Sequence, residues 1–420
     1  MLKNNIIKNC RVCNTRISKQ DVVIDMGKMA VTGVFLKKKI KTSFKPKITL
    51  VLCKKCKLLQ LKEIVNPNFL FKNYWYESGI NSTMKNHLFN LSKYSISLFK
   101  NKNIRSLDIG CNDGTLMESL SKYIKKKNIY GIDPAKGIFK KKNYNFHNSF
   151  FNKKTIVKNF SNKKFNLITS VAMFYDVNNP IQFVKEISDI LDEKGIWICE
   201  LNYLGDLVKN LSFDTICHEH VSYYSLSTFK NILDKTDLKI RDISFNTING
   251  GSIRITIDKN NKKINPNIKK FLNYEKRYLK LDKVITYKKF NKNLLSLRKK
   301  INNFMINLKN KNKKIAILGA STRGNTILQY LGLNEKDFIG ASDRNPKKNG
   351  MYMNGTLIPI FSEKKVREEK PDFFFILPYF YIDEILDREK FFLKNGGKIL
   401  SPLPKPTIFY WNKKIKELRI

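Results

Sequence analysis

At two places in this chain an apolar strand, a glycine turn and a helical stretch follow one another directly, and this feature constrains the fold most. The first place is the strand 104–109 with the turn Gly110–Gly114, and the second is the strand 313–318 with the turn Gly319–Gly324. In such a unit the glycines let the backbone approach a ligand at a helix N-terminus. The sequence therefore predicts two Rossmann-like α/β domains.

The length of 420 residues exceeds what one hydrophobic core usually supports. We expect an N-terminal module at 1–72, a central doubly wound domain at 73–300 and a C-terminal Rossmann-like α/β domain at 301–420. The chain has no run of eighteen apolar residues, and its first residues lack the apolar core of a signal peptide. We therefore expect a cytoplasmic protein that makes no membrane contact.

The formal net charge is +45, from 80 basic and 35 acidic side chains. Clustered Lys and Arg would indicate a polyanionic partner, because they release counterions from phosphates. Here the lysines are spread over the whole chain among many Asn and Ile residues. This pattern is typical of an AT-rich coding bias, and short charge runs are usually solvent-exposed faces of helices and turns. We expect no specific nucleic-acid partner.

Four of the seven cysteines form two C-x-x-C pairs, Cys10 with Cys13 and Cys53 with Cys56. Four thiolates complete a tetrahedral Zn²⁺ shell with no open position, which is typical of a structural site. The alternatives are a redox pair or a chance spacing. A redox pair needs only one C-x-x-C followed by a helix, so we favour structural zinc in the module 1–72.

Acidic residues end two successive strands, Asp108 before the first glycine turn and Asp133 after the strand 129–132. This combination favours a methyltransferase over a dehydrogenase, since a carboxylate at the second strand can accept both ribose hydroxyls of S-adenosylmethionine (SAM). The sulfonium and amino acid of this donor also favour acidic and polar groups near the turn. The expected cofactor-binding residues are Asp108, Gly110, Asn112, Asp113, Gly114, Asp133 and Phe150.

The segment 213–225 is the densest in titratable and aromatic groups. His218 and His220 flank Glu219, and in an extended segment residues two apart face the same way, so both imidazoles could line a pocket. Histidine changes its charge near neutral pH, which suits acid–base catalysis. The alternative is a hydrogen-bonded structural cluster. Tyr74 and Tyr76 are further pocket candidates, although aromatic clusters at a domain junction often only pack.

The order of these motifs resembles the zinc-containing, three-domain C-methyltransferases that act on nucleotide-linked deoxysugars. The resemblance spans nearly the full chain. The further motifs that carry it are Tyr-x-Tyr-x-Ser-Gly at 74–79, Asn-Gly-Gly-Ser-Ile-Arg at 249–254, Gly-x-x-x-x-Gly-Asn-Thr at 319–326, Asp-Arg-Asn-Pro at 343–346 and Gly-Thr-Leu-Ile-Pro-Ile at 355–360.

The resemblance implies that His220 is a general base, with Glu219 beside it. Removing a proton next to a ketone gives an enolate that attacks the sulfonium methyl group, and Tyr76 and Tyr224 are candidate hydrogen-bond donors to that enolate. The helix start at 321–325 suits a nucleotide diphosphate, unless the loop is inherited and binds nothing. The expected substrate-binding residues are Tyr74, His218, Asn249, Arg254, Ser321, Arg323, Asn325 and Asp343.

Three positions depart from the sugar enzymes. Cys217 stands where they carry a tyrosine, the segment 172–176 lacks their pocket histidine, and Phe380 stands where an aromatic–Asn pair is usual. These departures leave room for another keto sugar or another acceptor. RNA methylation, a dehydrogenase that uses the Gly319 loop and a non-catalytic nucleotide-binding protein are the alternatives. The sequence leaves open which sugar is methylated and whether the protein is a monomer or a dimer.

Overall fold

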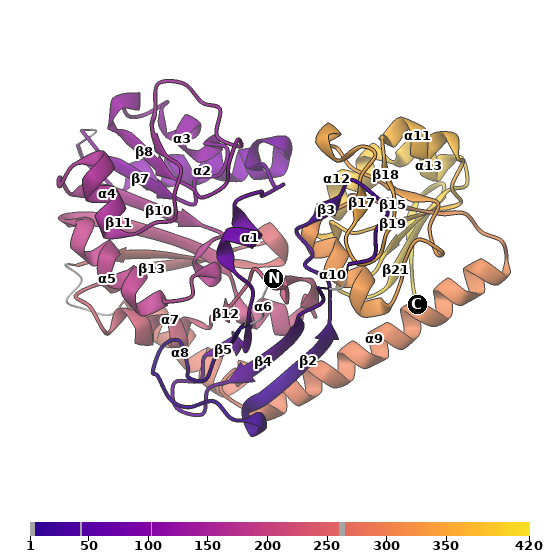
Figure 1. Ribbon diagram of the computed structural model, residues 1–420, viewed down its shortest axis with the longest axis horizontal. Helices are drawn as coiled ribbons and strands as arrows, with labels where there is room; N and C mark the ends of the chain where they lie inside the picture. The colour runs from indigo at the N-terminus through magenta and orange to yellow at the C-terminus, as the bar shows by residue number, and fades with distance from the viewer. Residues whose placement is uncertain (1–4, 43, 102, 260–264) are drawn as a thin grey trace.

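The computed structural model describes residues 5–42, 44–101, 103–259 and 265–420. Figure 1 shows two α/β domains side by side, with the N-terminal module below and between them. Each α/β domain contains a seven-stranded sheet, which confirms the predicted fold class.

The central sheet has the order β13-β14-β11-β10-β7-β8-β9. The five strands from β9 to β11 are parallel, and β14 and β13 complete the sheet as an antiparallel pair. The strand order reverses between β7 and β10, where ligands bind in open sheets of this type. The strands are β7 (Ser106–Ile109), β8 (Ile129–Ile132), β9 (Asn145–His147), β10 (Phe165–Val171), β11 (Leu191–Asn202), β13 (Lys239–Asn246) and β14 (Ser252–Asp258).

Helices cover both faces of this sheet, which explains why every residue of β7 is buried. One group packs around α2, which begins after Asn81, whose side chain accepts a hydrogen bond from the Met84 amide. The other group packs around α5. The helices are α2 (Ser82–Ser97), α3 (Thr115–Leu120), α4 (Lys153–Phe160), α5 (Pro180–Ile190), α6 (Leu204–Lys209) and α7 (Leu226–Leu233).

The C-terminal sheet repeats this plan with the order β18-β16-β15-β19-β20-β21-β22. Its first five strands are parallel, and β21 and β22 continue the sheet with antiparallel pairings. The strand order reverses between β15 and β19. The strands are β15 (Ile315–Leu318), β16 (Gly340–Ser342), β18 (Ile360–Phe361), β19 (Phe373–Ile376), β20 (Lys398–Ser401), β21 (Thr407–Asn412) and β22 (Lys414–Arg419). The helices are α10 (Thr322–Leu331), α11 (Glu363–Glu368), α12 (Ile382–Arg388) and α13 (Lys390–Lys394).

The N-terminal module pairs strands with both domains. Its four-stranded sheet, β12-β5-β4-β2, takes β12 from the central part of the chain, and its β3 pairs with β17 of the C-terminal domain. These elements are β1 (Asn5–Ile6), β2 (Val22–Lys28), β3 (Phe35–Leu36), β4 (Lys47–Leu52), β5 (Leu59–Leu61), β6 (Glu63–Ile64), α1 (Pro67–Phe71), β12 (Ser222–Tyr223) and β17 (Tyr352–Met353). The module therefore holds the two α/β domains together.

A single long helix, α9 (Val284–Asn310), connects the two α/β domains after the short helix α8 (Pro266–Tyr274). It runs along β2 in Figure 1, where the Asn291 side-chain amide donates a hydrogen bond to the Val23 carbonyl at 2.6 Å. The predicted domain boundary between residues 300 and 301 falls inside this helix. Within the described ranges no helix is long and apolar enough to cross a bilayer.

Candidate active site

A cavity of about 520 Å³ lies where the two sheets present the ends of their first strands. It is lined by the turn after β7 and by the turn after β15, so both strand-order reversals open into one space. The expected site residues that line it are Tyr74, Tyr76, Asp108, Gly110, Asn112, Asp133, Phe150, Glu219, His220, Asn249, Ser321, Arg323 and Asp343. The roles of these residues stay predictions.

The turn after β7 is held tightly against the sheet. Gly110 has φ +73°, and its amide donates a 2.9 Å hydrogen bond to the Ile132 carbonyl. A Cβ atom on Gly110 would lie only 3.0 Å from the Met173 side chain. Only glycine fits this backbone conformation and this spacing without strain.

The two strand-end carboxylates lie on the donor side of the cavity. Asp108 accepts a 2.8 Å hydrogen bond from the Thr169 hydroxyl, and burial raises its pKa to about 7. Asp133 accepts hydrogen bonds from the Asn112 and Ala135 amides at 2.9 and 2.8 Å, and burial raises its pKa as well. The backbone bonds fix the Asp133 carboxylate at the end of β8, where it suits a donor's ribose hydroxyls.

Two expected cofactor residues do not line this cavity. The Asp113 carboxylate accepts a 2.7 Å hydrogen bond from the Gly79 amide and a second from the Thr115 hydroxyl. Gly114, with φ +81°, caps α3 beneath the Phe139 ring. Asp113 therefore holds the segment 76–79 over the turn and Gly114 starts the helix, and a contact of these two residues with the donor stays a prediction.

The catalytic candidates His220 and Glu219 lie in the bend before β12. The His220 ring packs on Tyr175 with ring centroids 4.2 Å apart. Burial and the positive charge of Arg323 lower the pKa of His220 to about 3, against a weaker opposing hydrogen bond with the Thr215 backbone. The imidazole is therefore neutral at pH 7, and this is the form that can accept a proton.

Glu219 is 3 % exposed, and burial raises its pKa. Within the described part of the chain neither carboxylate oxygen has a hydrogen-bond partner of good geometry, although the Gly33 backbone and the Cys217 thiol lie beside them. An unpartnered buried carboxyl group on a cavity wall is available to a ligand.

Four further expected site residues do not line the cavity. Tyr224 packs between Phe174 and Phe229. Arg254 forms an ion pair with Glu200 at 2.9 Å. The remaining two are Asn325, which donates to the Asn354 carbonyl at 3.0 Å, and His218, which donates to the Pro46 carbonyl at 3.2 Å. The roles expected of these four residues stay predictions.

His218 gives a prediction of pH-dependent stability. It is fully buried, and burial lowers its pKa to about 4, below the value of about 6.5 in an unfolded chain. Below pH 6.5 the unfolded state binds a proton that the folded state does not, so stability falls as the pH decreases toward 4. We expect His218→Gln, which keeps the donor to Pro46, to remove on the order of 3 kcal/mol of this loss.

Urea unfolding of wild type and His218→Gln at pH 7.5 and 4.5 measures the effect. Acid effects elsewhere in the protein are common to both proteins and cancel in the comparison. An equal loss of stability in both proteins would show that His218 is not buried in its neutral form.

On the acceptor side, Arg323 connects the two α/β domains. Its guanidinium forms an ion pair with Asp214 at 2.6 Å, donates to the Asn249 carbonyl at 2.7 Å and lies over the Phe380 ring. The Tyr379 hydroxyl donates to the same Asp214 carboxylate at 3.1 Å. A phosphate would have to compete with these partners for Arg323, so the helix start is a weaker diphosphate site than the sequence predicted.

Asp343 is also engaged, since Lys348 pairs with it at 2.9 Å. Sequence reasoning missed Asp214 and Tyr379, because their partners are distant in the chain, and it also missed Lys348. It also missed Asp176, which lines the cavity just after β10. The position of Asp176 at the end of a central strand is a signal that could have found it.

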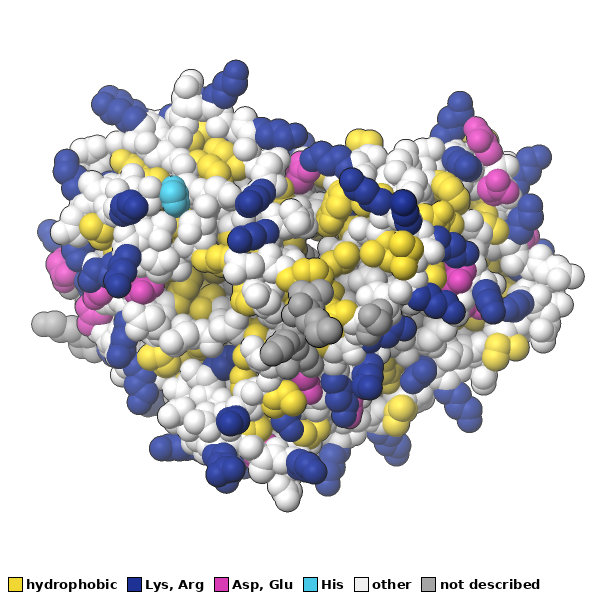
Figure 2. Space-filling view, viewed as in Figure 1, with side chains coloured by type: hydrophobic (Ala, Val, Ile, Leu, Met, Phe, Trp, Pro, Cys, Tyr) yellow, Lys and Arg dark blue, Asp and Glu magenta, His cyan; other side chains and the backbone are white. Residues whose placement is uncertain are grey.

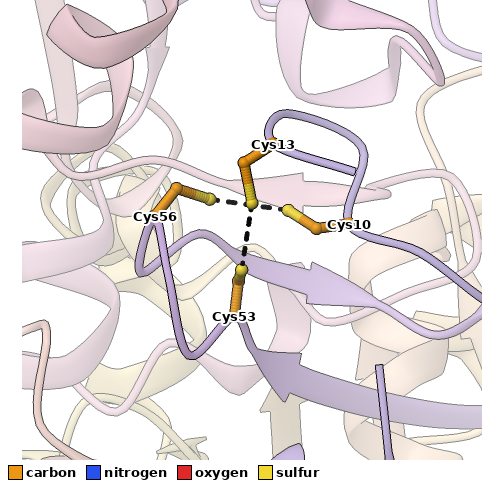
Figure 3. A group of neighbouring side chains, drawn as sticks. All are labelled: Cys10, Cys13, Cys53 and Cys56. Carbon is orange, nitrogen blue, oxygen red and sulfur yellow. Dashed lines mark hydrogen bonds between the residues drawn. The ribbon is translucent and has the colours of Figure 1, made fainter. Parts of the chain in front are cut away.

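The four cysteine sulfurs of the N-terminal module turn toward one point (Figure 3). All lie within 4.8 Å of one another, with Cys10–Cys56 at 3.5 Å and Cys13–Cys53 at 3.4 Å. A tetrahedral zinc ion with 2.3 Å bonds needs sulfurs roughly 3.8 Å apart. Hydrogen bonds from the Cys53 and Cys56 thiols lower the pKa of Cys10, which favours a thiolate there. The donor set fits a structural zinc ion.

Comparisons with known proteins match three successive families. Residues 10–71 match a zinc binding domain, residues 84–243 a methyltransferase domain, and residues 247–404 the C-methyltransferase C-terminal domain. The C-methyltransferase NovU of Streptomyces niveus is 26 % identical over 376 residues, which are 86 % of this chain and 87 % of NovU.

Among solved structures, the magnesium protoporphyrin IX methyltransferase of Synechocystis PCC 6803 with bound SAM is 9 % identical, with a TM-score of 0.31 over 41 % of this chain and 78 % of that one. The ribosomal protein L11 methylase of Lactobacillus delbrueckii subsp. bulgaricus is 15 % identical, with a TM-score of 0.29 over 42 % of this chain and 79 % of that one.

The matched domains, the turn at the β7 strand end and the four-cysteine cluster together define a SAM-dependent methyltransferase with structural zinc. This confirms the predicted enzyme class. More specifically, in the order of its three matched domains and along most of its length the chain is similar to zinc-containing C-methyltransferases such as NovU.

Proposed function

We propose that this enzyme methylates a carbon beside the ketone of a nucleotide-linked keto-deoxysugar, with His220 as the base that forms the enolate. The observation that carries the proposal is one cavity lined by the donor turn at Gly110, by His220 and by the second turn at Gly319. A base between two nucleotide-type turns suits a reaction between two nucleotide-carrying molecules.

When bound, SAM supplies the methyl group. The protein's own residues provide the rest. Asp133 suits the donor's ribose, and the neutral imidazole of His220 takes the acidic proton. The rings of Tyr74 and Phe150 line the cavity and exclude water from the reacting carbon. Ser321 and the start of α10 line the cavity on the side proposed for the acceptor's nucleotide, and the Ser321 hydroxyl also accepts a hydrogen bond from the Gly324 amide.

The test uses purified protein, methyl-labelled SAM and a panel of uridine- and thymidine-diphosphate-linked keto-deoxyhexoses. We expect mass spectrometry to find the label on a carbon next to the ketone. The matched control is each sugar with its ketone reduced to an alcohol, which lacks an acidic C–H bond and should gain no label. Equal labelling of the reduced sugars would indicate O-methylation, and labelling of no sugar would also contradict the proposal.

RNA methylation is less well supported. The Lys and Arg side chains in Figure 2 are scattered over the visible face and do not gather in a stripe that could follow a phosphate backbone. On this face the positive charge is distributed.

A further inference from the structure

Asp176 is a titratable cavity residue that no role above uses. It ends the short helical turn η4 (Phe174–Asp176), which follows β10 directly. Asp176 lines the same cavity as Glu219 and His220. The Val221 amide donates a 2.9 Å hydrogen bond to the Tyr175 carbonyl, and the Tyr175 ring packs on His220. These contacts tie the Asp176 turn to the segment that holds the proposed base.

The carboxyl groups of Asp176 and Glu219 lie on the cavity wall. The buried Oδ1 atom of Asp176 accepts no hydrogen bond from any residue in the described ranges. The oxygens of Glu219, which is 3 % exposed, have no partner of good hydrogen-bond geometry there, although the Cys217 thiol and the Gly33 backbone lie beside them. Buried polar atoms in proteins are almost always satisfied by protein, water or ligand. The unsatisfied Asp176 oxygen therefore indicates a place for a polar ligand group.

Charge decides which of the two acids holds a proton. Burial raises the pKa of Asp176 well above its ordinary value, and the negative charge of Glu219 raises it further. Burial also raises the pKa of Glu219, but hydrogen bonds with its own backbone, the Cys217 thiol and the Gly33 backbone oppose this rise. Two neighbouring carboxyl groups in a poorly solvated site share one proton. The ionisable groups that interact with Asp176 are Tyr74, Tyr175, Cys217 and Tyr223, and none of them is a cation that would favour loss of the shared proton.

We propose that Asp176 is a further catalytic residue, a neutral carboxylic acid that donates a hydrogen bond to the ketone oxygen of the acceptor while His220 removes the neighbouring proton. The proposal rests on the proposed function. Asp176 would supply a hydrogen-bond donor to the enolate oxygen in place of Tyr224, one of the two expected donors, which does not line the cavity.

The step balances. The C–H electron pair of the acceptor carbon becomes the enolate double bond, the proton moves to the free ring nitrogen of His220, and the negative charge gathers on the oxygen that faces Asp176. The enolate carbon then attacks the sulfonium methyl group, which leaves the methylated ketone and S-adenosylhomocysteine. The Asp176 proton stays on its carboxyl group throughout, and the imidazolium later loses its proton to solvent.

Infrared spectroscopy tests the protonation state without any acceptor. Wild type and Asp176→Asn, both carrying ¹³C-labelled aspartate and bound to SAM at pH 7, are compared by difference spectra. We expect wild type to show the carbonyl stretch of a protonated aspartic acid that the variant lacks. Absence of this band from the difference spectrum would overturn the proposal, whatever the acceptor is.

Kinetics with the keto sugar that wild type methylates tests the catalytic role. We expect Asp176→Ala to lower kcat on the order of 10²-fold, as removal of one oxyanion donor does, with little change in KM or in SAM affinity. Asp176→Asn keeps an N–H donor and should lose less. A merely structural role would change SAM affinity or stability instead, and unchanged kcat in Asp176→Ala would overturn the proposal.

The matched control is Asp282→Asn. Asp282 also carries a buried, unpartnered oxygen within the described ranges, but it does not line the cavity. We expect wild-type kcat from this control. Failure of wild type to methylate any keto sugar would contradict the proposed function itself, whereas methylation that persists in Asp176→Ala contradicts only the role of Asp176.

Discussion

Replacement of His220 with alanine is expected to lower methyl transfer by 10²- to 10⁴-fold while SAM still binds, because the variant lacks the group that takes the acceptor's proton. His220 packs on Tyr175 in the segment before β12, whereas the Gly110 turn and Asp133 follow β7 and β8. Its loss should therefore leave the SAM dissociation constant within a few-fold of wild type. Turnover of labelled SAM and isothermal titration with S-adenosylhomocysteine measure the two quantities.

Proton removal can also be followed apart from methyl transfer. In heavy water with S-adenosylhomocysteine bound, wild type should exchange the acceptor's proton next to the ketone for deuterium, and His220→Ala should not. The matched control is His147→Ala, on the edge strand β9 and outside the cavity lining. Retained exchange in His220→Ala would reject the base role even if methylation were slowed.

Short local patterns in the sequence were enough to predict the architecture. The turns at Gly110 and Gly319 each combine a buried strand with a helix start, and the structure places both at the reversal points of two doubly wound sheets. The four cysteines likewise needed only their spacing to indicate a zinc cluster. The glycine turns and the cysteine pairs could be predicted because each depends on a few residues that are close together in the sequence.

Contacts between distant segments could not be predicted in this way. Arg323 was expected to face a phosphate, but Asp214, more than a hundred residues earlier, takes up its charge. His218 and His220 share a spacing that suits a common pocket, yet a bend before β12 turns only His220 toward the cavity. Side chains two residues apart face the same way only in a regular β-strand, and the segment that holds these histidines is not a strand.

The zinc module contacts the segment that carries the proposed base, His220. The Leu61 amide of β5 donates a 2.9 Å hydrogen bond to the Val221 carbonyl, directly after His220, and Gln60 pairs with Ser222 of β12. Cys53 and Cys56 hold the loop that leads into β5. The metal site therefore supports the segment that positions His220.

We expect Cys53→Ser to lose zinc, to lower the melting temperature on the order of 10 °C and to abolish most methyl transfer. A structural zinc ion contributes several kcal/mol to folding, and each kcal/mol corresponds to about 2–4 °C in a domain of 150–250 residues that unfolds as a unit. Native mass spectrometry measures the zinc, calorimetry the melting temperature and labelled SAM the activity. Prolonged chelation of wild type should have the same effects, and added Zn²⁺ should reverse them.

Cys199→Ala is the matched control, because Cys199 is fully buried on β11 but lies outside the four-cysteine cluster. It should keep its zinc and most of its activity. A Cys53→Ser protein that lost zinc but methylated the acceptor at the wild-type rate would show that β5 holds Val221 without help from the metal. Because β12 begins two residues after His220, any loosening of β5 should lower kcat before it affects SAM binding at the distant Gly110 turn.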